Sequence, residues 1–249
     1  MRALLVATAF LTRVPVRVHA DGRDVGHAAR WFPLVGAALG GLGALLARGF
    51  VEVPNLPVSL QALLLVGLGA WITGGIHLDG LADTADGFGG GHDRDDVLRI
   101  MRDPRIGSFG ALALVLIVGI KVAARAALLD RRAAIRALIA APTLSRWTIV
   151  ALGAWLPYAR LEGGLGQAVT GPPDRGRLLW ATASTAAVVA IVAGWHALVL
   201  GAVAAAMAAL VGRAARRRIG GVTGDVFGAA VELTETAVLL GAVLLSGRG

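Results

Sequence analysis

The sequence contains no cysteine and few charged residues. Without cysteine there is no disulfide, no thiolate metal ligand and no cysteine nucleophile. Only 16% of the 249 residues are charged and 56% are hydrophobic, whereas about 25% of an average soluble domain is charged. Such a chain lacks the polar side chains that cover a water-exposed globule, and it is too apolar to be disordered. These shortages exclude a soluble enzyme, a coiled coil and a secreted disulfide scaffold, and they indicate a polytopic membrane protein.

Lysine is almost absent as well, because 23 of the 24 cationic residues are arginine and the net charge is +8. In a soluble protein this excess would suggest nucleic acid as a partner. In a membrane protein, cations in loops instead contact anionic lipid headgroups. We therefore predict the lipid bilayer, and no nucleic acid, as a partner. Some of the arginines are also candidates for binding a phosphorylated substrate.

Long apolar windows predict the fold. A helix needs about 20 apolar residues to cross a hydrocarbon core of about 30 Å. Small residues within these windows, such as Gly36, Gly40 and Gly43, let helices pack closely. The sequence predicts an all-α fold in a single domain, residues 1–249: a transmembrane helical bundle of about seven spans, with six or eight left open. The windows are 32–50, 58–76, 109–129, 134–156, 178–194, 197–212 and 228–245.

The apolar N-terminal segment, residues 1–11, is too short to span a membrane. It has one Arg ahead of it and runs into residues 12–15 (TRVP) rather than a small-residue cleavage site. We predict an interfacial helix here rather than a signal peptide.

The distribution of cations predicts the orientation. With the N-terminus in the cytoplasm, 16 of the 24 cations fall in cytoplasmic segments, as the positive-inside rule requires. This predicts a multi-pass membrane protein with its N-terminus in the cytoplasm. The cytoplasmic segments are 1–31, 77–108, 157–177 and 213–227. The cations of the opposite side are Arg48, Arg131, Arg132, Arg136 and Arg248, and those within spans are Lys121, Arg125 and Arg146.

An acidic cluster follows the second window. Asp79, Asp83 and Asp86 are spaced i, i+4 and i+7, so they share one face of a helix. Three carboxylates on one face repel each other unless a cation neutralises them, and oxygen ligands favour Mg²⁺ or Mn²⁺ over zinc. We predict that these three residues bind Mg²⁺. The alternative is a solvated acidic face, although such a face more often interleaves Lys or Arg.

Charged residues beyond this cluster fall into two groups. Asp93, Asp95 and Asp96 follow a run of glycines and predict a capped, solvated helix start. Arg102 and Arg105 lie on the same side of the membrane as the carboxylates. Arginine pairs with phosphate in two-point geometry, so both are candidates for binding a phosphorylated ligand. The alternative is contact with lipid phosphate.

A second group of polar residues enters the last window. Asp225 and Glu232 are spaced i and i+7, and Glu232 and Glu235 fall inside or near the hydrocarbon, where a carboxylate is usually functional. Arg146 is also inside a window. The alternative to a functional role is that Arg146 pairs with Glu232 or Glu235 and so holds helices together. His77 is a candidate general base, with helix packing as the alternative.

These residues fall in blocks that resemble the cobalamin synthase family, the adenosylcobinamide-GDP ribazoletransferases. The blocks run in the family's order from residue 10 to residue 235, and the most specific one contains HLDGLADT. They are residues 10–15 (FLTRVP), 32–36 (FPLVG), 73–87 (TGGIHLDGLADTADG), 101–107 (MRDPRIG), 145–146 (SR), 220–225 (GGVTGD) and 228–232 (GAAVE).

The resemblance implies an integral, multi-pass enzyme of the bacterial inner membrane whose active site faces the cytoplasm. This enzyme joins adenosylcobinamide-GDP to α-ribazole or its 5′-phosphate. GMP leaves, adenosylcobalamin or its phosphate forms, and Mg²⁺ is required. The resemblance implies Mg²⁺ on Asp79, Asp83 and Asp86. It implies catalytic roles for Asp83, Asp86, Asp225, Glu232 and His77, and phosphate binding by Arg13, Arg102, Arg105 and Arg146. Homo-oligomerisation is left open.

Two other functions fit parts of the sequence. A proton- or cation-coupled transporter would explain charged residues inside spans, but it predicts inverted repeats, and no repeat is evident. A non-catalytic membrane scaffold leaves the acidic cluster without a reason. The sequence therefore favours the enzyme.

Overall fold

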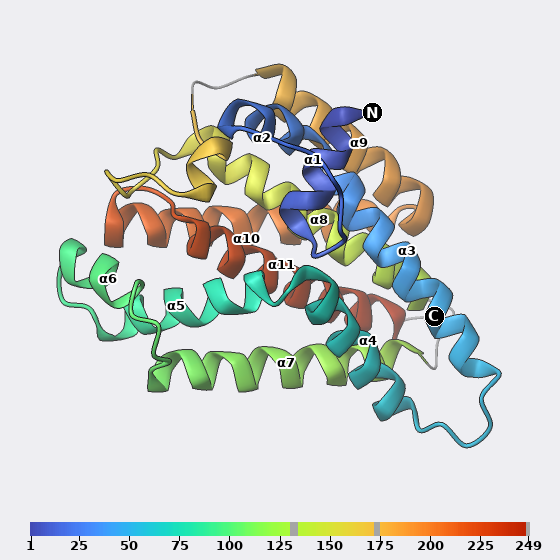
Figure 1. Cartoon of the computed structure of the whole chain (residues 1–249). Coiled ribbons are helices and arrows are strands. Elements are labelled where there is room, and N and C mark those ends of the chain that lie inside the picture. Colours follow the sequence, from blue (N-terminus) through green and yellow to red (C-terminus); the bar gives the residue numbers. More distant parts are fainter. Residues whose placement is uncertain (130–133, 172–174, 248–249) are drawn as a thin grey trace.

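The structure is a computed structural model that describes residues 1–129, 134–171 and 175–247. Within these ranges the regular structure is helical, with one isolated bridge between Tyr158 and Val222 and no strand. Figure 1 shows that α5, α7 and α10 run roughly parallel to one another. The helices are α1 (Arg2–Leu11), α2 (Gly22–Ala28), α3 (Phe32–Val51), α4 (Val58–Thr73), α5 (Ile76–Gly90), α6 (Arg94–Ile100), α7 (Ser108–Leu129), α8 (Ala134–Trp155), α9 (Arg175–Ala193), α10 (His196–Ile219) and α11 (Gly224–Ser246), with two 3-10 helices, η1 (Ala29–Trp31) and η2 (Leu165–Val169).

The predicted all-α bundle is confirmed. Within the described ranges, six helices are long and apolar enough to cross a membrane, and the bent pair of α4 and α5 makes seven if it counts as one span. Six of the seven apolar windows each coincide with one helix, although α10 continues to Ile219, well beyond the predicted end at residue 212. The N-terminal segment forms the helix α1, whose buried side chains include Val6, Ala7 and Leu11.

The second window, 58–76, was wrong as a straight span. Helix α4 ends at Thr73, and α5 starts at Ile76 after a bend of 90°. Gly74 and Gly75 make the bend, because both have positive φ, at 68° and 71°, a conformation that costs glycine little. At 16 residues, α4 alone is shorter than a straight crossing requires. The acidic residues therefore begin a separate helix.

Helix α8 is the most deeply buried of the candidate spans, and α3 packs closely along it. A Cβ atom on Gly36 would lie 2.2 Å from the carbonyl oxygen of Pro142, and one on Gly40 would lie 2.4 Å from that of Leu138. The close packing predicted for Gly36 and Gly40 is confirmed. It is wrong for Gly43, because a Cβ atom there would meet no atom within 4 Å.

The four segments assigned to one side of the membrane meet at one end of the bundle. Arg94 of α6 donates to the carbonyls of Ile219 and Ala159, at 3.1 and 2.7 Å. Helix α2 packs on η2, where a Cβ atom on Gly26 would lie 2.7 Å from the carbonyl oxygen of Ala168. Of the cations assigned to the opposite side, Arg131, Arg132 and Arg248 lie outside the described residues.

Candidate active site

A cleft of about 680 Å³ lies beside α5, between that helix and the loop before α7. Asp79 and Asp83 of α5 line one side, and Arg102 and Arg105 of the loop line the other. The helical spacing that predicted a shared face for the two carboxylates is confirmed. Asp79 is exposed and Asp83 is half-buried, and neither forms a salt bridge with another described residue. The cleft thus sets free carboxylates opposite arginines.

The close crossing of α5 and α11 brings a third carboxylate next to this face. A Cβ atom on Gly80 would lie 2.9 Å from the Cα atom of Asp225, and one on Gly228 would lie 3.0 Å from the carbonyl oxygen of His77. Glycine at both positions lets the backbones approach. Asp79 and Asp225 are consequently among the negative charges nearest to Asp83.

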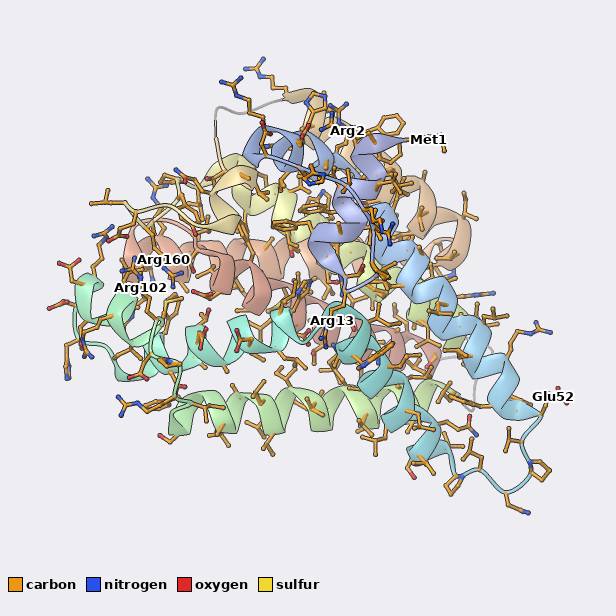
Figure 2. All side chains as sticks on the ribbon, viewed as in Figure 1. Met1, Arg2, Arg13, Glu52, Arg102 and Arg160 are labelled. Atoms are coloured by element: carbon orange, nitrogen blue, oxygen red, sulfur yellow. The ribbon has the colours of Figure 1, made fainter. Side chains whose placement is uncertain are left out.

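Arg160 pairs with Asp225, and sequence reasoning missed this arginine. Its Nη2 donates to Oδ2 of Asp225 at 2.6 Å and to the carbonyl oxygen of Met101 at 3.5 Å. The hydroxyl of Thr223 also donates to Asp225, at 3.2 Å. Figure 2 shows Arg160 close to Arg102 at one end of the molecule. The clustering of cations in segment 157–177 was the one signal that pointed to this residue.

Asp86, predicted as a metal ligand, holds the start of α7. Its Oδ2 accepts from the backbone N–H of Gly107 at 2.7 Å, and its Oδ1 accepts from that of Gly110 at 2.8 Å. A Cβ atom on either glycine would lie 2.3 Å from a carboxylate oxygen. A carboxylate in this position satisfies unpaired N–H groups and complements the helix dipole. Both oxygens of the buried Asp86 are therefore engaged by backbone.

The two arginines of the cleft already have acidic partners. Arg102 lies in the loop before α7, and Glu162 lies in the segment between α8 and η2. Nη2 of Arg102 is 2.5 Å from Oε2 of Glu162. Arg105 donates to Asp103 from Nε and Nη2, at 3.0 and 2.8 Å. These hydrogen bonds hold the pKa of the Asp103 carboxyl at about 2, and the Arg102 guanidinium lowers the pKa of Glu162. The two carboxylates are therefore ionised at neutral pH, so an anionic ligand has to compete with them for both arginines.

Arg13, also predicted to bind phosphate, lies at the edge of the cleft. Its backbone N–H donates to the carbonyl oxygen of Ile72 at 2.7 Å. Its side chain covers Gly74, where a Cβ atom would lie 2.7 Å from Cδ of Arg13. Gly74 lines the cleft, and Figure 2 places Arg13 beside the junction of α4 and α5.

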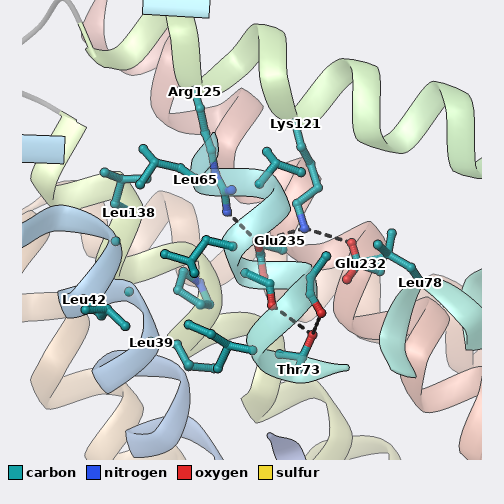
Figure 3. Close-up of a pocket in the computed structure, with 18 of the residues that line it drawn as sticks. Leu39, Leu42, Leu65, Thr73, Leu78, Lys121, Arg125, Leu138, Glu232 and Glu235 are labelled. Carbon is teal, nitrogen blue, oxygen red and sulfur yellow. Dashed lines mark hydrogen bonds and ion pairs between the residues drawn. The ribbon is translucent and has the colours of Figure 1, made fainter. Parts of the chain in front are cut away.

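Arg146 and Glu232 do not reach this cleft, because they belong to a buried ion cluster between α7, α8 and α11. Glu235 Oε2 accepts from Arg146 at 2.6 Å, which confirms the alternative that Arg146 pairs with a glutamate to hold helices together. Figure 3 shows Lys121 and Arg125 extending from α7 toward Glu235 and Glu232. The members of the cluster are Lys121, Arg125, Arg146, Glu232 and Glu235, and all five line a second cavity of about 70 Å³.

His77 faces the buried cluster rather than the cleft. It is buried on α5, and Arg146, Glu235 and Lys121 are the charges nearest to it. Its Nε2 has no hydrogen-bond partner among the described residues. This position matches the helix-packing alternative better than that of a general base.

The cleft offers Mg²⁺ two carboxylate ligands rather than a complete set of protein ligands. Among the described residues, no three His, Asp or Glu side chains gather closely enough to hold one ion. Mg²⁺, however, usually binds through one or two carboxylates together with water and substrate phosphates. Asp79 and Asp83 supply such a pair of oxygen donors, and the arginines opposite suit the phosphates.

Fold and cleft together describe a bundle of candidate membrane-spanning helices with a cleft that carries charged residues of both signs at one end. A model of the cobalamin-5-phosphate synthase family matches residues 3–243. Proteins named adenosylcobinamide-GDP ribazoletransferase are similar over almost the whole chain. The one from Chlorobaculum tepidum is 40% identical, covering 99% of this chain and 97% of its own. The one from Pseudomonas aeruginosa PAO1 is 41% identical, covering 98% of each. No solved structure matches.

The chain therefore belongs to the cobalamin-5-phosphate synthase family. It is a transferase of cobalamin biosynthesis, and the resemblance seen in the sequence blocks is confirmed.

Proposed function

We propose that the protein transfers the adenosylcobinamide phosphate group of adenosylcobinamide-GDP to α-ribazole or α-ribazole 5′-phosphate in a Mg²⁺-dependent reaction. GMP leaves, and adenosylcobalamin or its 5′-phosphate forms. The observation that carries this proposal is the cleft itself, where Asp79 and Asp83 lie opposite Arg102 and Arg105. A diphosphate needs both cationic donors for its oxygens and carboxylates that hold its metal ion. The names of the relatives support the same substrates.

Arg102 and Arg105 bind the diphosphate in this proposal. Each guanidinium exchanges its present carboxylate partner, Glu162 or Asp103, for phosphate oxygens. Both pairs are exposed to solvent, and exposed pairs contribute little to stability, so the exchange costs little. Arg13 at the edge of the cleft is a third candidate for the same ligand. Asp79 and Asp83 hold Mg²⁺, while Asp86 positions the loop by fixing the start of α7.

The transfer breaks the phosphoanhydride bond of the diphosphate and forms a phosphate ester bond to the ribazole. A hydroxyl of the ribazole attacks the phosphorus nearer the cobinamide, the bond to the oxygen of GMP breaks, and the hydroxyl proton leaves. When bound, Mg²⁺ offsets the charge of the diphosphate and of the departing GMP. Asp225 is placed beside Asp83 to accept the proton, and Arg160 and Thr223 hold its carboxylate in position. The buried cluster, which contains Glu232 and Arg146, holds α7, α8 and α11 together.

The chemistry requires water-soluble nucleotide substrates, so the cleft end of the bundle belongs on the cytoplasmic side of the bacterial inner membrane. The excess of cations in the four segments that meet at this end supports the same orientation.

The test is release of GMP by the purified protein in liposomes with adenosylcobinamide-GDP and α-ribazole 5′-phosphate. We expect GMP and adenosylcobalamin phosphate with Mg²⁺ and neither with EDTA. Asp83→Asn should lower the rate by roughly 100-fold or more, because a metal ligand is lost. Asp95→Asn is the matched control, since the Asp95 side chain is 90% exposed on α6. Metal-independent product formation, or full activity of Asp83→Asn, would refute the metal site. Absence of product with either acceptor would refute the reaction.

A further inference from the structure

The charges of the buried ion cluster do not balance. Three cations, from Lys121, Arg125 and Arg146, face two carboxylates, from Glu232 and Glu235. Their side chains are at most 10% exposed. Within the described part of the chain the cluster thus carries one positive charge in excess. An uncompensated charge in a low-dielectric interior is costly, so a further group is needed to offset it.

Two of the arginines have donors left over. Nε of Arg125 and Nε of Arg146 are buried without a hydrogen-bond partner among the described residues. Both arginines line the cavity beside the cluster, which measures about 70 Å³. This is several times the space that one water molecule needs. The cavity therefore offers room and free N–H donors for an oxygen-bearing anion.

The other wall of the cavity is apolar and reaches the outside of the bundle. It is formed by Leu39, Leu42 and Gly43 of α3 and by Leu65 and Gly69 of α4. Leu42 is 41% exposed, and the space around Gly43 is open. Helix α3 belongs to a candidate membrane span, and α4 forms another together with α5, so we expect this apolar wall to face the acyl chains of the bilayer.

We propose that this cavity binds the anionic headgroup of a membrane lipid, a carboxylate or a phosphate, with the acyl chain lying between α3 and α4. Arg125 and Arg146 donate to the headgroup oxygens, and the negative charge offsets the excess cation. The site is separate from the cleft, and it does not depend on the reaction proposed above. It also gives the buried arginines a ligand that reaches them through the membrane rather than through water.

The test compares ligands added to the protein in a neutral detergent. We expect phosphatidic acid to raise the unfolding temperature by several degrees and to remain bound one-to-one in native mass spectrometry. Phosphatidylcholine, whose headgroup is neutral overall, should do neither, and inorganic phosphate should give no comparable shift. An equal shift with inorganic phosphate would overturn the assignment to a lipid. No shift and no adduct with phosphatidic acid would overturn the site.

Two variants locate the binding. Arg125→Gln removes the excess charge, while Lys121 and Arg146 still pair with Glu235, so we expect a folded protein that binds phosphatidic acid at least roughly tenfold more weakly. Gly43→Phe should block the apolar wall and weaken binding without touching the cluster. Arg48→Gln, which changes an exposed arginine near the end of the same helix, α3, should bind as the wild type does. Retention of phosphatidic acid by both Arg125→Gln and Gly43→Phe would place the lipid elsewhere and overturn the proposal.

Discussion

The cleft and the buried ion cluster both contain carboxylates and cations, but they use them differently. In the cleft, Asp79 and Asp83 have no salt-bridge partner among the described residues. In the cluster, the single carboxylate of Glu235 pairs with Arg125 of α7 and with Arg146 of α8. Unpaired carboxylates that face each other destabilise a fold and prepare it to bind a cation. Carboxylates that pair across helices fix the packing. This difference supports our proposal that a binding site and a structural site are separate within a single bundle.

The largest effect is expected from breaking the cluster. Glu235→Gln leaves Arg125 and Arg146 without their carboxylate, and loss of one partner of a buried ion network costs about 3–5 kcal/mol. We expect a loss of this size in the free energy of unfolding in detergent. Glu52→Gln, at an exposed position after α3, is the control and should unfold as the wild type does. An unfolding free energy unchanged in Glu235→Gln would contradict the structural role.

The next effect sharpens the role of the cleft arginines. Arg102→Gln and Arg105→Gln should each raise the KM for adenosylcobinamide-GDP by roughly tenfold, because a charged hydrogen bond to phosphate is lost. Stability should hardly change, since both arginines are exposed. Arg99→Gln is the matched control, an exposed arginine of α6 that does not line the cleft. Equal KM values for all three variants would show that these arginines do not select the diphosphate.

Substitution of Asp86 distinguishes a structural role at the start of α7 from a role as a metal ligand in the cleft. Asp86→Ala removes the acceptor for the N–H groups of Gly107 and Gly110 and should cost about 1–2 kcal/mol of stability, as loss of a helix cap does. The Mg²⁺ concentration for half-maximal activity should stay within about twofold of wild type. A large increase in that concentration with little loss of stability would identify Asp86 as a metal ligand instead.

The smallest effect is expected from releasing Arg105. Asp103→Asn removes the carboxylate that competes with the substrate, so the KM for adenosylcobinamide-GDP should fall roughly two- to fivefold. The pKa of Asp103 is about 2, so this carboxylate stays ionised at any pH near neutrality. The ratio of the KM of the wild type to the KM of Asp103→Asn should therefore be the same from about pH 6 to pH 8. A ratio that changes across this range would point to another titrating group.

The sequence predicted most of the bundle because apolar length and helical spacing are local properties. The windows located the helices, and the spacing of Asp79 and Asp83 placed both carboxylates in one cleft. The bend at Gly74 was not predicted, since glycine inside an apolar window is compatible with both close packing and positive φ.

Partners that are far apart along the chain could not be predicted from the sequence, for a different reason. The role of Asp86 depends on N–H groups more than 20 residues away, and the pairing of Lys121 with Glu232 spans 111 residues. Spacing along one helix does not reveal which other helix lies opposite. Arg160 was missed on the same ground, because only the fold places its loop beside Asp225.

The central claim is that the cleft carboxylates serve chemistry at some cost to stability, whereas those of the cluster serve stability. The most direct test measures the unfolding temperature and the rate of GMP release on the same preparation of Asp83→Asn. Because Asp79 and Asp225 repel the charge of Asp83, we predict an unfolding temperature equal to or above that of the wild type, together with a rate at least roughly 100-fold lower. A lower unfolding temperature with a wild-type rate for the folded fraction would contradict the account.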